Sequence, residues 1–229
     1  MKNGGFLMSI SSDSSRGLST QAVQRMPYYL TYLKKLHQQG VSTVPASVIA
    51  SEFNLSEIQA RKDLAAICRG GGKPRSGFAI HDLIVSIEDI LGFNDTSDAV
   101  LVGAGHLGQA LMMYGGFKVY GLNIIAAFDN NKEKIGTSIN QKQILDAEKI
   151  PNLCSRMKAH IGIIAVPADC AQHVCDRLVE GGVIGIWNFA PVNLTVPDYV
   201  KVQNENMAAS LALLSRHVHD QLKREADEF

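Results

Sequence analysis

Cysteine, tryptophan and long apolar runs are all scarce in this chain of 229 residues, which has four cysteines and one tryptophan. The cysteines include no C-x-x-C pair, so a disulfide framework is not expected and reduced thiols are the default. No apolar run reaches the roughly 18 residues of a membrane span, and the N-terminus lacks a signal-peptide core of about 7 to 15 apolar residues. We therefore expect a cytoplasmic protein, with 46 % hydrophobic residues to form its core.

A net charge of one sign is also absent, because 22 Lys and Arg balance 22 Asp and Glu. The distribution along the chain is uneven. Residues 1–84 carry ten cations and five anions, a balance of 10 − 5 = +5, whereas residues 85–229 carry twelve and seventeen, a balance of 12 − 17 = −5. Only the first part therefore suits a polyanionic partner such as nucleic acid.

The N-terminal part predicts a small helical domain at residues 19–84, after a Ser- and Gly-rich arm at residues 1–18 that we expect to be mobile. Apolar residues at three- and four-residue spacing indicate a first helix from Ser19 to near Gly40, in which Pro27 either starts the main section or introduces a kink. A second short helix follows Pro45, where proline is favoured near a helix start.

A third helix is predicted from the S-x-x-Q capping box of Ser56 and Gln59. Ala60, Leu64 and Ile67 can share its buried face. Three short helices with a tight turn between the last two are typical of a helix-turn-helix domain that binds double-stranded DNA.

The candidate DNA contacts are polar residues of the third helix and cations in the glycine-rich stretch after it. The glycines and a proline cannot continue the helix, so a flexible basic wing is predicted there. The alternative is a solvated charged helix followed by a loop. The candidate residues are Gln59, Arg61, Lys62, Lys73 and Arg75.

The second part begins with a glycine pattern typical of dinucleotide sites. The apolar run Ala99–Val102 leads into G-x-G-x-x-G at Gly103, Gly105 and Gly108, and a helical pattern follows. The glycines let the backbone approach a pyrophosphate at the helix N-terminus. Asp129 ends the next apolar run, 129 − 108 = 21 residues later, near the spacing of about 20 for a ribose-binding acid. This pattern favours NAD(H) over NADP(H), unless Asp129 only caps a helix or turn.

Further buried strands are predicted at residues 161–166 and 183–187, with a helix around residues 171–178 between them. The alternation predicts an α/β fold, a doubly wound parallel sheet of Rossmann type at residues 85–205. Such sheets bind ligands at their strand ends. The further candidate lining residues are His106, Leu107, Val166, Pro167 and Phe189, although His106 has a solvent-facing loop position as its alternative.

No convincing catalytic acid or base accompanies the glycine loop. Tyr114 and Lys118 have the Tyr-x-x-x-Lys spacing of short-chain dehydrogenases, but they follow the first helix and enclose two glycines. The i, i+3, i+5 spacing of Cys170, His173 and Cys175 does not converge on one helical face, so buried helix positions explain these residues better than a metal site. An NAD-dependent oxidoreductase and a CoA- or nucleotide-binding module remain alternatives.

The C-terminal segment, residues 206–229, carries an apolar stripe at helical spacing from Met207 to Leu222. The stripe either covers its own sheet or crosses to a second copy of the chain. A dimer would place two recognition helices over a two-fold-symmetric operator.

From about Thr20 to about Leu222 the chain resembles the Rex family of bacterial redox-sensing transcriptional repressors. The segments that carry the resemblance are Arg61–Leu64, Gly103–Gly108, Tyr114–Phe117, Ala126–Asp129, Ala165–Ala168 and Asn188–Pro191. Each segment is a modest signal, but the set in this order is specific.

The resemblance implies a homodimer with an N-terminal winged helix, a Rossmann domain and a domain-swapped last helix. In that family NADH binding releases operator DNA, whereas NAD+ permits binding. By matching position, Tyr114 resembles the family's gating tyrosine beside the nicotinamide. The helix and wing cations named above would contact DNA, and the three glycines with Asp129 would hold the dinucleotide.

Two positions depart from the family pattern. Thr31 stands where the family usually has an arginine in the first helix, and Asn206 stands where it has an aspartate near the start of the last helix. These charges are associated with redox coupling, and a Thr/Asn pair cannot form their ion pair. The wing also differs, with a glycine run at residues 70–72. We expect DNA binding to persist and the NADH response to be weaker or differently organised.

Overall fold

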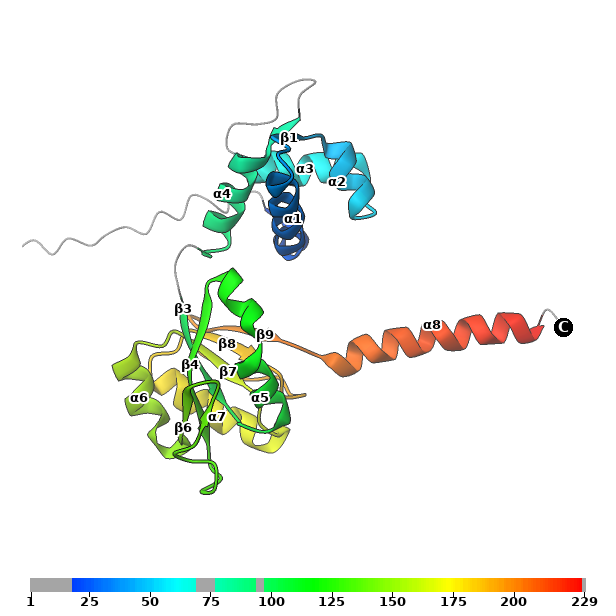
Figure 1. The fold of residues 1–229 in the computed structure, drawn as a ribbon. Coiled ribbons are helices and arrows are strands. Elements are labelled where there is room, and N and C mark those ends of the chain that lie inside the picture. The colour runs from blue at the N-terminus through cyan, green and yellow to red at the C-terminus, as the bar shows by residue number, and fades with distance from the viewer. Residues whose placement is uncertain (1–17, 69–76, 94–96, 228–229) are drawn as a thin grey trace, which may run out of the picture. The chain divides into compact units, whose positions relative to one another are not determined.

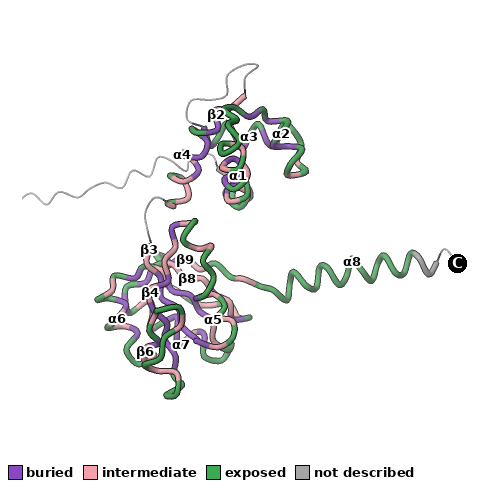
Figure 2. Tube along the Cα trace, viewed as in Figure 1, coloured by how far each residue is buried: buried purple, intermediate pink, exposed green. Residues whose placement is uncertain are grey.

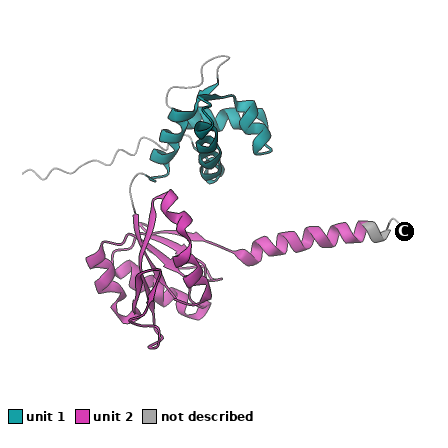
Figure 3. Cartoon of the chain, viewed as in Figure 1, with its two compact units in different colours: residues 1–95 teal, residues 96–229 magenta. Residues whose placement is uncertain are grey.

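A computed structural model describes residues 18–68, 77–93 and 97–227 of the chain. The chain divides into two compact units, residues 1–95 and residues 96–229 (Figure 3). Each unit has its own hydrophobic core.

In its described residues, the first unit has four helices and a two-stranded antiparallel sheet (Figure 1). Its core is closed by buried side chains of α1, α3 and α4, among them Tyr29, Leu64 and Ile87. We predicted a domain end at residue 84, but α4 runs through this position and buries Ile87 in the same core. The elements are α1 (Thr20–Gln38), β1 (Thr43–Val44), α2 (Ala46–Glu52), α3 (Glu57–Ile67), β2 (Phe78–Ala79) and α4 (Ile80–Ile90).

Serine side chains cap the starts of α1 and α3, and of these two caps the sequence predicted the one at Ser56. Ser19 Oγ accepts a hydrogen bond from the Ala22 N–H, and Ser56 Oγ accepts one from the Gln59 N–H, each at 3.2 Å. Pro27 lies inside α1, so it does not start the helix. The predicted wing cations Lys73 and Arg75 lie outside the described residues, as does all of the predicted arm except its last residue.

The second unit is built on a seven-stranded sheet in the order β5-β6-β4-β3-β7-β8-β9. Only β5 is antiparallel to its neighbour, and the six parallel strands have the order of a doubly wound dinucleotide-binding fold. The strands are β3 (Ser97–Val102), β4 (Leu122–Asp129), β5 (Ser138–Ile139), β6 (Lys142–Asp146), β7 (Ile161–Ile164), β8 (Gly185–Asn188) and β9 (Lys201–Asn204).

The helices that precede α8 in this unit connect strands and pack against the sheet (Figure 1). Two buried clusters, one for each face, pack between sheet and helices. The strand predicted at residues 161–166 ends at Ile164, and β5, β6 and β9 were not predicted. The helices are α5 (His106–Met113), η1 (Gly115–Tyr120), η2 (Ala147–Lys149), α6 (Ile150–Met157), α7 (Ala168–Glu180) and α8 (Met207–Asp227).

Helix α8 confirms the predicted C-terminal helix. Every residue from Met207 to Arg224 is exposed, including the whole apolar stripe (Figure 2). The stripe therefore does not cover the chain's own sheet. Among the described helices, none combines the length and the apolar character that crossing a bilayer requires.

Candidate functional site

The three glycines of the G-x-G-x-x-G pattern differ in structural role: Gly103 and Gly105 lie between β3 and α5, and Gly108 lies within α5. Gly103 has φ +102°, and a Cβ there would lie 2.5 Å from the Ala165 carbonyl oxygen. A Cβ on Gly108 would overlap the Gly103 carbonyl oxygen. Both positions therefore need glycine so that the loop can pack. A Cβ on Gly105 would meet nothing within 4 Å, so the space beside this backbone is open.

Asp129 ties the end of β4 to this loop. Its Oδ2 accepts a hydrogen bond from the Ala104 N–H at 2.8 Å and lies 3.4 Å from Lys134 Nζ, while its Oδ1 accepts from the Asn131 N–H at 2.8 Å. The carboxylate is only 8 % exposed. Lys134 therefore places a cation beside the Asp129 carboxylate.

A cavity of about 460 Å³ opens at the carboxyl ends of β3, β4 and β7. It lies where the parallel strand order reverses between β3 and β7, which is the usual ligand position in such sheets. The structure brings five predicted residues to its wall: Gly103, Gly105, Asp129, Val166 and Pro167. The other predicted cofactor contacts, His106, Leu107, Gly108, Tyr114 and Phe189, are not among its lining residues.

Helix α7 supplies further lining residues that do not belong to the glycine motif. Cys170, His173 and Arg177 all face the cavity. We had explained Cys170 and His173 as buried helix residues, but both are exposed, and only Cys175 is buried. The i, i+3, i+7 spacing of the three residues was the available signal for one shared face. Within the described ranges, no cluster of His, Cys, Asp and Glu is suited to hold a metal ion.

Four aromatic rings form a chain of contacts from the end of α5 and η1 to the end of β8. Centroid distances are 4.8 Å from Tyr114 to Phe117, 5.4 Å from Phe117 to Trp187 and 4.8 Å from Trp187 to Phe189. The first two contacts are edge-to-face, a favourable arrangement for aromatic pairs. Tyr114 is 58 % exposed, and its ring lies so close to Gly116 that a Cβ there would be 2.5 Å from it. We call Tyr114, Phe117, Trp187 and Phe189 the aromatic cluster.

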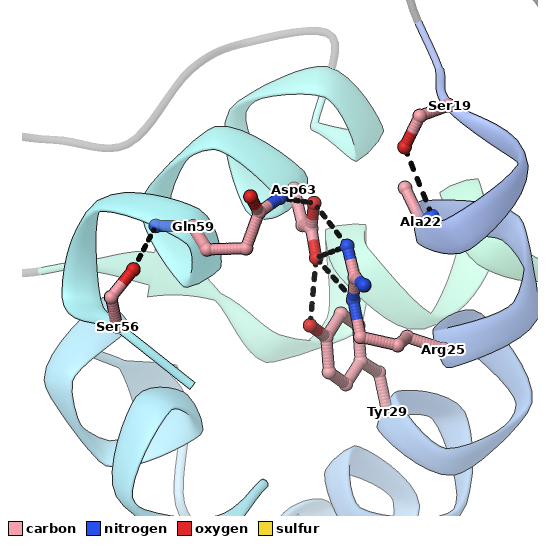
Figure 4. Close-up of polar contacts among 7 residues, drawn as sticks. All are labelled: Ser19, Ala22, Arg25, Tyr29, Ser56, Gln59 and Asp63. Carbon is pink, nitrogen blue, oxygen red and sulfur yellow. Dashed lines mark hydrogen bonds and ion pairs between the residues drawn. The ribbon is translucent and has the colours of Figure 1, made fainter. Parts of the chain in front are cut away.

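In the first unit, a buried carboxylate holds the predicted recognition helix in place (Figure 4). Asp63 of α3 accepts hydrogen bonds from the Arg25 guanidinium at 2.8 and 3.0 Å and from the Tyr29 hydroxyl at 2.8 Å. The Gln59 side-chain amide donates a further bond to Asp63 at 2.8 Å. Gln59 thus takes part in the cap of α3 through its backbone N–H, while its side chain bonds to Asp63 within the unit.

The network sets the protonation states of its members. Burial alone would raise the pKa of Asp63, but the hydrogen bonds from Arg25, Tyr29 and Gln59 outweigh it and hold the pKa below its usual value. Burial, helped by the hydrogen bond to Asp63, raises the pKa of Tyr29 to about 12. Asp63 is therefore a carboxylate and Tyr29 a neutral phenol at neutral pH.

The outer face of α3 carries the remaining predicted DNA contacts. Arg61 and Lys62 are both exposed, beside the 82 %-exposed Ile58. Glu57 lies one turn before Arg61 and forms an ion pair with it. The face therefore presents one paired cation, at Arg61, together with the exposed cation Lys62.

The two residues that depart from the family pattern have local roles. The Thr31 hydroxyl donates to the Pro27 carbonyl at 3.0 Å. Asn206 Oδ1 accepts from the Ala209 N–H at 2.9 Å and so caps the start of α8. Neither side chain carries a charge.

Both units match known protein families. Residues 17–65 match the family described as putative DNA-binding protein N-terminus. Residues 94–192 match the family described as CoA binding domain.

Curated relatives match over most of the chain. A protein of Treponema denticola named redox-sensing transcriptional repressor Rex is 40 % identical over 193 residues, 84 % of this chain and 91 % of the relative. A protein of Carboxydothermus hydrogenoformans with the same name is 40 % identical over 196 residues, 86 % of this chain and 94 % of the relative.

Solved structures of a Rex-family repressor are also similar to this chain. RSP, a Rex-family repressor, in complex with β-NAD+ and operator DNA superposes with a TM-score of 0.83 at 32 % identity, covering 92 % of this chain and 97 % of that one. RSP in complex with β-NADH superposes with a TM-score of 0.79 at 31 % identity, covering 91 % and 98 %. The identity and coverage are sufficient to assign the chain: it belongs to the Rex family of redox-sensing transcriptional repressors.

Proposed function

We propose that this protein is a transcriptional repressor that binds operator DNA and senses the NADH/NAD+ ratio through its second unit. The observation that carries the proposal is the open space beside Gly105, in a cavity at the switch point of the parallel sheet. A pyrophosphate needs this space because its oxygens bond to backbone N–H groups at a helix N-terminus.

The residues around the cavity fit an NAD(H) molecule. Gly105 would face the pyrophosphate, and Asp129 has lone pairs left to accept hydrogen bonds from the adenosine ribose. Val166 and Pro167 would flank the dinucleotide along the strand ends. Tyr114 and Phe189 would meet the nicotinamide, which is the part of the coenzyme that gains or loses a hydride.

For DNA, we propose that α3 enters a major groove. Arg61 and Lys62 would contact phosphates or base edges, and Lys73 and Arg75 would act in the wing. Gln59 is a weaker candidate than the sequence suggested, since its side chain bonds to Asp63. A repressor acting on operator DNA works where the DNA is, and we expect it in the cytoplasm.

We infer that two chains form a homodimer through α8. The stripe Met207, Leu211, Leu214, Val218 and Leu222 leaves each side chain 48–62 % exposed in the single chain. Such a stripe on a 21-residue helix requires an apolar partner. A second copy supplies an identical stripe and produces the two-fold symmetry that an operator palindrome needs.

We further infer that the coenzyme is sensed and not consumed. The relatives are named as repressors. The CoA alternative has one specific support, the matched family described as CoA binding domain. CoA therefore belongs in the test as a competitor.

The test is the fluorescence anisotropy of a labelled palindromic operator with the purified protein, across NADH/NAD+ ratios at fixed salt. We expect tight binding with NAD+ and release as NADH rises. The same samples, incubated with candidate hydroxy acids, should show no change in NADH absorbance. An anisotropy that follows CoA and ignores NADH would overturn the proposal, as would steady NADH turnover.

A further inference from the structure

A side-chain hydrogen bond connects the aromatic cluster to Glu205, the residue that precedes the N-cap of α8. The Trp187 indole N–H donates to Glu205 Oε1 at 2.9 Å. An indole N–H is a donor only, and a carboxylate is a strong acceptor, so this bond is charge-assisted. Glu205 directly precedes Asn206, whose side chain caps α8.

Glu205 is also held by its backbone. Its N–H donates to the Asn188 carbonyl at 2.8 Å, and the Asn188 amide donates to Asn204 Oδ1 at 2.8 Å. Asn188 is fully buried. These bonds hold the backbone of Glu205 against the ends of β8 and β9. From this position its side chain accepts the hydrogen bond from Trp187.

The cluster lies at the same edge of the sheet as the proposed nicotinamide site. Trp187 and Asn188 end β8, and Asn204 ends the neighbouring β9 in parallel register. Tyr114 is the exposed end of the cluster, while Trp187 is half-buried against the core layer. A ligand that moves the Tyr114 ring thus changes the packing of Phe117 and then of Trp187.

We propose that Glu205 is a positioning residue for the redox response, which couples the state of the aromatic cluster to the start of α8 through Trp187. This inference rests on the proposed function, because it takes NADH as the ligand of the cluster. Glu205 would then be an acidic coupling residue directly before Asn206, and Asn206 stands where the family usually has an aspartate. Both residues belong to the second unit, so the link needs no contact with the first.

The experiment measures the operator affinity of Glu205→Ala, Trp187→Phe and the double variant with NAD+ and with NADH. The ratio of the two affinities should fall at least about fivefold in each single variant, the lower range of a typical coupling between sites. The double variant should fall no further than either single variant, because both remove the same bond. Glu205→Gln, whose amide oxygen still accepts the bond, should keep most of the ratio. Glu180→Ala, an exposed glutamate at the end of α7, is the matched control.

A spectroscopic readout separates coupling from a loss of folding. Trp187 is the sole tryptophan of the chain, so intrinsic emission reports this ring alone. NADH should quench the emission in the wild type and in Glu205→Gln, and in Glu205→Ala the free protein should already emit at a shifted wavelength. If NADH leaves both emission and operator binding of the wild type unchanged, the proposed function fails. If NADH releases operator from Glu205→Ala and Trp187→Phe as it does from wild type, this inference fails alone.

Discussion

Asp63 accepts a pair of hydrogen bonds from one guanidinium, from Arg25 Nε at 2.8 Å and from Arg25 Nη2 at 3.0 Å. The residues are 38 positions apart, and their contact fastens α3 to α1. Such a bidentate pair fixes orientation as well as distance. Asp63 is 2 % exposed, so its charge depends on these partners.

Replacing Asp63 with Ala should destabilise the first unit by about 3 kcal/mol, because the Arg25 charge and the Tyr29 hydroxyl lose their buried acceptor. Urea unfolding followed by circular dichroism measures the change. Glu57→Gln on the same helix breaks only an exposed ion pair and should cost less than about 0.5 kcal/mol. Equal effects of the two variants would show that the buried network adds no stability.

The pH dependence of stability follows from the lowered pKa of Asp63. A depressed pKa gives stability that is complete above the unfolded value of about 3.9 and is lost as the pH falls through the folded value. The midpoint of urea unfolding should therefore fall in acid for the wild type and depend less on pH for Asp63→Asn. Parallel curves for the two proteins would contradict the prediction.

Tyr29 should ionise late in an alkaline titration. Its pKa is raised to about 12, against about 10 for a free tyrosine, so its stabilising contribution is present below pH 10 and is lost as the pH rises through 12. The absorbance of phenolate, followed with pH, should contain one late step that Tyr29→Phe removes. A wild-type titration without this step would contradict the buried network.

Gly105→Ala should lower NADH affinity by about tenfold or more, near 1.4 kcal/mol, without lowering the unfolding temperature. Its Cβ meets no protein atom and enters the space assigned to the pyrophosphate. Gly108→Ala is the contrasting variant, whose Cβ overlaps a backbone oxygen and should cost about 1–3 kcal/mol of stability. NADH fluorescence titration and thermal unfolding give the two readouts. Unchanged affinity in Gly105→Ala would remove the pyrophosphate from this position.

Lys62→Ala should weaken operator binding and reduce the salt slope of log K against log [salt] by about 0.9, the value for one phosphate contact on duplex DNA. Lys201→Gln removes an exposed cation of the second unit and should leave the slope unchanged. Anisotropy at several salt concentrations measures both. A wild-type slope in Lys62→Ala would exclude a phosphate contact at this residue.

Leu214→Glu should shift the protein from dimer to monomer, weakening association at least about tenfold, near 1.4 kcal/mol, because it places a charge in the apolar stripe of α8. Arg216→Gln lies on the opposite face of the helix and should leave the dimer intact. Sedimentation equilibrium gives the mass of each. A dimeric Leu214→Glu would show that α8 is not the interface.

Local signals predicted much of the fold. Apolar spacing predicted α1, the Ser56 capping box predicted the start of α3, and the glycine spacing predicted the turn between β3 and α5. Short or irregular elements were missed: β5 has two residues, and β9 follows a long stretch without regular structure. Such strands carry too few residues to show a period, and their neighbours in the sheet stabilise them.

The sequence predicted only those residues of the candidate site that belong to a recognisable motif. Gly103, Gly105 and Asp129 belong to one motif with a fixed spacing, and the structure brings them to one cavity. Lys134 and Arg177 also line that cavity, but no motif connects either residue with the glycine loop. No motif connects Arg25 or Tyr29 with Asp63, so the buried network was not predicted.

The sequence by itself determined where helices begin, where the backbone needs glycine and which residues form the buried stripes, because these depend on interactions within a few positions. Tertiary structure decided which side chains contact one another. It turned the Gln59 amide towards Asp63, and it brought Trp187 to Glu205, 18 positions away. Interactions between neighbouring residues allow many long-range side-chain contacts. The order of the strands and the packing of the helices select one set of these contacts, and that order exists only in the assembled sheet.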